Sequence, residues 1–126
     1  MTARSVECEI GGKKYHLRFE RADVKALEQR LQASYMYFLT PHVFTSMTAT
    51  EAFVHRGLRV ETRTGNLEHA FELNEKGEDE AGELLFEHMD EIHIIHDKIL
   101  EAFIAAGMFK KAEQGGDLQP EEKPKN

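Results

Sequence analysis

The sequence has little cysteine, proline or tryptophan, and each shortage narrows the class of protein. Its 126 residues contain one cysteine, three prolines and no tryptophan. A lone cysteine forms no disulfide within the chain, so a hydrophobic core must hold the fold, and we expect a reducing cytoplasm as its compartment. Cys8 lies in an alternating apolar and polar stretch without a positive neighbour to lower its thiol pKa. This context favours a small core residue over a catalytic thiol.

Long apolar runs and an excess of positive charge are also missing. No run approaches the roughly 20 apolar residues that cross a bilayer, and the first ten residues lack the apolar segment of a signal peptide. The formal net charge of −7 argues against a nucleic-acid binder, which would carry a basic patch, and against affinity for anionic membranes. We therefore expect a soluble cytoplasmic protein that contacts neither nucleic acid nor membrane.

The first element that the sequence pattern predicts is a β-hairpin. Apolar residues alternate with glutamates over residues 6–10, and the glycine pair at 11–12 can take the positive φ of a two-residue turn. The return strand covers 13–19. Residues 21–33 then show the apolar spacing of an amphipathic helix. The sequence therefore predicts an α+β fold, in which an N-terminal hairpin packs on a mostly helical body.

Two helix starts follow in the middle of the chain. Thr40-Pro41 is a helix-start signal: threonine is a common N-cap residue, and proline is favoured at the first position of a helix. Thr48 and Glu51 match the spacing of a capping box, and the helix they open is expected to end at Gly57. Together these signals predict two short helical segments between residues 40 and 57.

The longest apolar periodicity runs from Glu83 to Lys111 and predicts one long C-terminal helix. A strand over 58–64 and a short helix from Leu67 to near Gly77 are expected before it. One line of the long helix holds Leu85, Met89, Ile92, His96, Ile99 and Phe103. This face covers more than the usual third of a helix, so the rest of the chain, a partner, or both must cover it. Residues 1–112 form one domain on this interpretation, and 113–126 a disordered tail.

Aromatic and methionine side chains near this helix are candidates for contact with another protein, because such residues are enriched at interfaces. The aromatic run at 35–38 fits either the core or an exposed patch. The apolar residues at the end of the long helix have little left in the chain to cover them. The candidate protein-binding residues are Tyr37, Phe38, Ile95, Phe103, Met108 and Phe109.

No nucleophile elbow, Walker loop or dinucleotide-binding glycine motif occurs in the sequence, so we expect a non-enzymatic protein without a cofactor. The histidines of the long helix leave one alternative open. His93, His96 and Asp97 are spaced to form half a metal site, which would make the chain a small metal-binding protein or enzyme. A second alternative is an oligomeric adaptor or regulatory module.

The order of the elements carries a family resemblance. A hairpin with the glycine turn (IGGKKYHLRF) precedes a helix with the pair Leu27-Glu28, a later helix ends at Gly57-Leu58, and the last helix ends in EAFIAAGMF. This layout resembles the tail assembly chaperones of long-tailed phages and prophages, including gene-transfer-agent proteins. The resemblance implies a protein that shields the tape-measure protein in the bacterial host cell while tail-tube subunits polymerise. It also implies self-association into a homo-oligomer.

Overall fold

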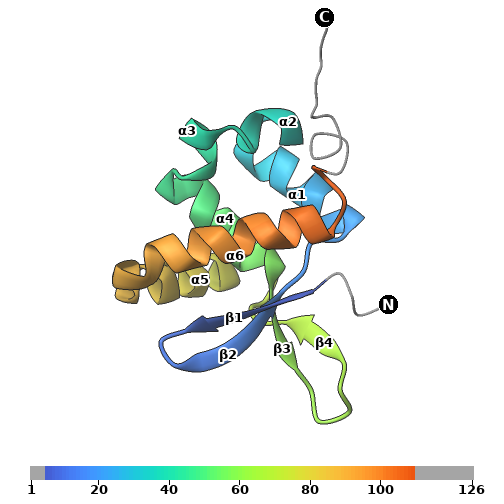
Figure 1. Cartoon of the computed structure of the whole chain (residues 1–126), viewed down its shortest axis with the longest axis vertical. Coiled ribbons are helices and arrows are strands. Elements are labelled where there is room, and N and C mark those ends of the chain that lie inside the picture. Colours follow the sequence, from blue (N-terminus) through green and yellow to red (C-terminus); the bar gives the residue numbers. More distant parts are fainter. Residues whose placement is uncertain (1–4, 110–126) are drawn as a thin grey trace, which may run out of the picture.

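The structure is a computed structural model that describes residues 5–109. The expected tail at 113–126 and the last residues of the expected long helix lie outside the described residues. The described chain forms a four-stranded antiparallel sheet with its helices gathered on one side (Figure 1). The strands, in sheet order, are β1 (Val6–Ile10), β2 (Lys13–Leu17), β3 (Leu58–Glu61) and β4 (Leu67–His69).

The predicted N-terminal hairpin is confirmed. Strands β1 and β2 pair antiparallel, with Cys8 opposite Tyr15 and both side chains buried. Gly11 and Gly12 make the turn with φ values of +60° and +82°. Only glycine takes this left-handed conformation without strain, so the turn follows directly from the glycine pair.

The helices also follow the sequence pattern, with an α+β fold as expected. The structure contains α1 (Arg21–Leu31), α2 (Tyr35–Phe38), α3 (Pro41–Phe44), α4 (Met47–Gly57), α5 (Glu75–Glu87), the short 3₁₀ helix η2 (Met89–Glu91) and α6 (Ile92–Ala105). Helix α3 begins at its proline and α4 ends at its glycine, as predicted. The cap of α4 is different: the Ser46 hydroxyl accepts a hydrogen bond from the Ala49 N–H at 3.1 Å, so Ser46 caps the helix instead of Thr48.

Two other expectations are wrong. The stretch starting at Leu67 forms strand β4 instead of a helix, and Gly77 lies in the first turn of α5 instead of after a helix. The C-terminal helix is present, but it does not run unbroken from Glu83. The chain leaves helical geometry at His88, passes through η2, and restarts as α6 at Ile92.

The break at His88 coincides with a contact made by the hairpin turn. The Gly11 N–H donates to the carboxylate of Glu91, 3.2 Å from either oxygen. The His88 ring lies so close that a Cβ on Gly11 would come within 2.4 Å of its Cε1. The turn therefore packs against the corner between α5 and α6, which ties the hairpin to the helices.

Phe103 on α6 stands at the centre of the core. Its ring stacks on Phe19 with the ring centroids 4.0 Å apart, and it meets Phe53 edge to face at 5.3 Å. Phe38 and Phe44 complete this aromatic cluster. Each aromatic pair adds about 0.5–1.5 kcal/mol beyond the area it buries. The cluster therefore holds α6 against α4 and the end of β2.

Candidate functional site

Three of the six predicted contact residues belong to the interior. The side chains of Phe38, Ile95 and Phe103 are at most 1% exposed. Phe38 and Phe103 are part of the aromatic cluster, and Ile95 lies on the inner face of α6. The expectation that these three residues contact a partner is corrected, because the chain itself covers them on every side. Most of the apolar face of the last helix is thus buried within the molecule.

The other three predicted contact residues lie at the surface. Tyr37 on α2 is 59% exposed. Met108 and Phe109, just beyond the end of α6, are partly exposed and line an apolar groove. That Tyr37, Met108 and Phe109 contact a partner remains a prediction. Met108 and Phe109 lie where α1, α2 and the end of α6 come together, and this is the candidate functional site; Tyr37 lies on α2 but is not part of the lining.

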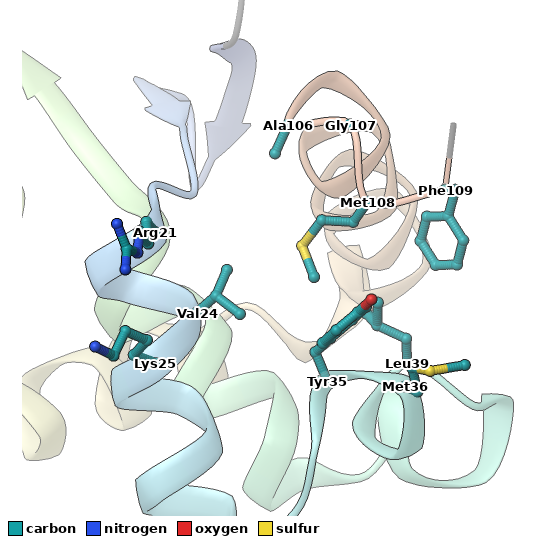
Figure 2. Close-up of a pocket in the computed structure, with 10 residues that line it drawn as sticks. All are labelled: Arg21, Val24, Lys25, Tyr35, Met36, Leu39, Ala106, Gly107, Met108 and Phe109. Atoms are coloured by element: carbon teal, nitrogen blue, oxygen red, sulfur yellow. The ribbon is translucent and has the colours of Figure 1, made fainter. Parts of the chain in front are cut away.

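We call this hollow the α1–α2 groove. It has a volume of about 920 Å³. Figure 2 shows its lining from three segments: α1 on one side, α2 below, and the end of α6 above. Val24 points from α1 towards Met108, and Tyr35 lies beneath them. The full lining is Arg21, Val24, Lys25, Tyr35, Met36, Leu39, Ala106, Gly107, Met108 and Phe109. Met36 is 71% exposed, so the lining includes an unbranched, adaptable side chain that is open to solvent.

The rim of the groove carries positive charge on an acidic protein. Arg21 and Lys25 lie one turn apart on α1, on either side of Val24 in the sequence. Both are exposed, and neither forms an ion pair with another residue of the part that the structure describes. The groove therefore combines an apolar floor with two unsatisfied cations. That combination fits an apolar polypeptide segment flanked by carboxylates.

Sequence reasoning did not single out this groove, although a signal was present. On a helix Arg21 has Val24 and Lys25 as its neighbours at i, i+3 and i, i+4, which places one apolar side chain beside two cations. Which other element would cover Val24 depends on the fold. The contributions of Tyr35, Met36 and Leu39 from α2 were therefore not visible in the pattern.

A second cluster that sequence reasoning missed is centred on Asp23, on a different side of α1. Asp23 is 1% exposed. Its carboxylate accepts from Arg56 at 2.9 Å, from Arg59 at 2.6 Å and from the Glu20 N–H at 2.9 Å. A buried carboxylate with several donors is satisfied internally. This cluster ties α1 to α4 and β3.

His69 borders this cluster, with its Nε2 3.9 Å from an Asp23 oxygen. Burial, followed by the nearby charge of Arg59, lowers the pKa of His69. The histidine is therefore neutral at physiological pH. The positive charge that balances Asp23 comes from the two arginines.

The alternative metal site at His93, His96 and Asp97 does not form in the part of the chain that the structure describes. His96 Nε2 is hydrogen-bonded to the Thr50 hydroxyl at 2.9 Å, which directs the ring towards α4. Burial, with a further contribution from His93, lowers the pKa of His96. Side chains of His93 and Asp97 are exposed. The three residues do not bring their donor atoms together, so the geometry does not support this metal-binding alternative.

Within residues 5–109, the one set of three donors close enough for a metal ion is His88, Asp90 and Glu91, all within 4.8 Å of one another. Glu91 already accepts from the Gly11 N–H and lies 3.5 Å from His88 Nδ1. An ion at this place would have to compete with the contact that holds the hairpin turn. The interactions of Glu91 with Gly11 and His88 therefore stabilise the junction between α5 and α6.

Cys8 has no feature of a nucleophile. Burial raises the pKa of its thiol to about 11. Near neutral pH almost none of it is thiolate, the form that reacts or binds metal. Cys8 therefore fills the core between the hairpin and α6, as the sequence pattern predicts.

Comparison with known proteins found no matching family model, no matching curated protein and no matching solved structure. Among the helices of the described part, none is both long enough and apolar enough to cross a membrane. The functional interpretation therefore depends on the groove itself.

Proposed function

We propose that the chain is a phage-type tail assembly chaperone, a non-enzymatic protein that binds the tape-measure protein in the host cytoplasm. It shields apolar helical segments of that protein while tail-tube subunits polymerise around it. The observation that carries the proposal is the α1–α2 groove, an apolar surface that the chain leaves uncovered beside its last helix. An apolar groove of this kind accepts one face of an amphipathic helix.

Three features of the molecule support a protein partner over a small substrate. The groove is open and lined mostly by apolar side chains, with methionines at 36 and 108 that adapt to differently shaped partners. Tyr37 extends the exposed aromatic surface along α2. The hairpin, the helix α1 and the α4–β3 junction at Gly57-Leu58 occur in the order of the chaperone family that the sequence resembles.

Co-expression with a helical fragment of the tape-measure protein from the same phage or prophage tests the proposal. The double variant Met36→Asp/Met108→Asp places charge in the groove, and Ile94→Asp places charge on an exposed part of α6 away from it. We expect the fragment to stay soluble with the wild type and with Ile94→Asp, and to precipitate with the double variant. Circular dichroism would establish that the double variant is folded.

Equal solubility of the fragment with all three proteins would overturn the proposed binding site. A fragment that precipitates even with the wild type would overturn the chaperone function. If the chain then still associated with itself, the oligomeric adaptor module would be the better interpretation.

A further inference from the structure

A second surface of the molecule is chemically complementary to the α1–α2 groove. Phe86, near the end of α5, is 71% exposed, although phenylalanine is among the residues most often buried. It borders a shallow acidic hollow formed by α5, α4 and α1. The carboxylates around this hollow are Glu51, Glu78, Asp79, Glu83 and Glu87, against the single cation Arg30.

The charges of this acidic surface are mostly unsatisfied. Arg30 lies 4.0 Å from Glu78 and so is already engaged. Glu83 and Glu87 are exposed and form no ion pair within the described part of the chain. An exposed aromatic ring flanked by free carboxylates is thus the chemical opposite of an apolar groove flanked by free cations.

The spacing on the two helices also matches. On α5, Glu83, Phe86 and Glu87 follow the pattern acid-x-x-apolar-acid. On α1, Arg21, Val24 and Lys25 follow base-x-x-apolar-base. In both, the two charges are one helical turn, about 5.4–6 Å, apart, and the apolar residue neighbours the first of them at i, i+3. Two antiparallel helices with this spacing can place both charge pairs against each other while the apolar residues meet to one side of the charges.

One chain cannot make this contact with itself. The end of α5 lies where α6 begins, and the groove lies where α6 ends, about 21 Å further along that helix (Figure 1). The contact must therefore join different molecules. Because the contact uses two different surfaces, a pair of copies keeps a free groove on one copy and a free Phe86 on the other, and further copies can add to build rings or open chains.

We propose that the α1–α2 groove binds α5 of a second copy of this chain, with Phe86 in the groove and Glu83 and Glu87 against Arg21 and Lys25. The aromatic ring supplies the apolar contact, and the charges fix which surfaces meet and how they are oriented. The inference does not rest on the proposed chaperone function, because it concerns contacts between identical chains only. If both proposals hold, a client helix and a second copy compete for one groove.

Charge reversal on each side provides the test, with the state of association measured by sedimentation over a range of concentrations. We expect the wild type to form oligomers. Arg21→Glu/Lys25→Glu and Glu83→Lys/Glu87→Lys each place like charges in the contact, so each should weaken self-association by at least about tenfold. An equimolar mixture of the two variants restores opposite charges and should restore assembly.

Two single substitutions separate the aromatic contact from general loss of apolar surface. Phe86→Ser should weaken assembly at least about tenfold while leaving the melting temperature of the monomer unchanged, because the side chain is exposed. Ile94→Ser removes another apolar residue that is 56% exposed, and assembly should persist. A wild type that stays monomeric, reversed variants that assemble normally, or a mixture that stays monomeric would each overturn the proposal.

Discussion

Helix α1 carries charges in two contrasting states on its two sides. On one side, Asp23 is buried and holds Arg56 and Arg59 by short ion pairs. On the other, Arg21 and Lys25 are exposed beside an apolar groove and pair with no residue in the described range. The difference in burial and pairing shows that charged residues serve two purposes on one helix. Charge that is satisfied inside the chain joins elements of the fold, whereas charge left at the edge of an apolar hollow is free to select another molecule.

The same contrast applies to the apolar residues of the C-terminal helix. Phe103 is enclosed by other rings of the core. Met108 and Phe109, a turn or two further on, line the open groove. The surface available for binding therefore begins where α6 leaves the core. It is smaller than the whole apolar face that the sequence pattern suggests.

The largest expected effect comes from removing the buried charge. Asp23→Ala leaves Arg56 and Arg59 without their shared carboxylate, and breaking a buried pair typically costs about 3–5 kcal/mol of the free energy of unfolding. Urea denaturation, at concentrations where the chain is monomeric, would measure it.

Arg21→Ala is the matched control on the same helix. Its side chain is exposed and unpaired, so the free energy of unfolding should change by less than about 0.5 kcal/mol. Equal losses for the two variants would remove the distinction between the two sides of α1.

A smaller effect is expected where the hairpin turn meets the corner at His88. Gly11→Ala forces a residue with a Cβ into positive φ, which costs about 1–3 kcal/mol, and drives that Cβ against the His88 ring. Gly12→Ala has the same backbone problem, but no heavy atom lies within 4 Å of its Cβ. Thermal unfolding should therefore show a larger loss for Gly11→Ala. Equal losses would indicate that the turn does not pack on this corner.

The smallest effect concerns acid sensitivity at His96. Burial lowers the pKa of His96 in the folded chain, so the unfolded chain, with its pKa near 6.5, takes up the proton first as the pH falls. The stability contributed by neutral His96 is complete above about pH 6.5 and is lost progressively below it. In denaturation experiments from pH 8 to pH 5, the free energy of unfolding should fall less steeply for His96→Gln than for the wild type. Parallel curves would show that His96 does not contribute.

The sequence pattern predicted those elements that are determined by residues within the element itself. The glycine pair sets the hairpin turn, and the proline sets the start of α3. The break at His88 was missed because the apolar periodicity continues through it from Leu85 to Ile92, with no glycine or proline in between. The break coincides with a contact to Gly11, which lies far away in the chain. Strand β4 was mistaken for a helix because three residues are too few to establish a period.

The candidate site was predictable only in part, for a similar reason. Met108 and Phe109 were identified because little chain remains to cover them. Phe38, Ile95 and Phe103 had the same apolar character, and only packing distinguishes them. Asp23 stands in the first turn of α1, where a carboxylate is favourable whatever else it contacts. Its actual partners lie on other elements, at sequence separations that no helix periodicity reports.

The most direct test of the central claim, that the groove binds a second copy of this chain, is the methyl NMR spectrum of the methionines across a dilution series. Met36 and Met108 line the groove, and Met47, at the start of α4, lies outside it. We predict that the methyl signals of Met36 and Met108 shift with concentration while the signal of Met47 stays constant. Signals of Met36 and Met108 that remain fixed from the lowest to the highest concentration would contradict the account.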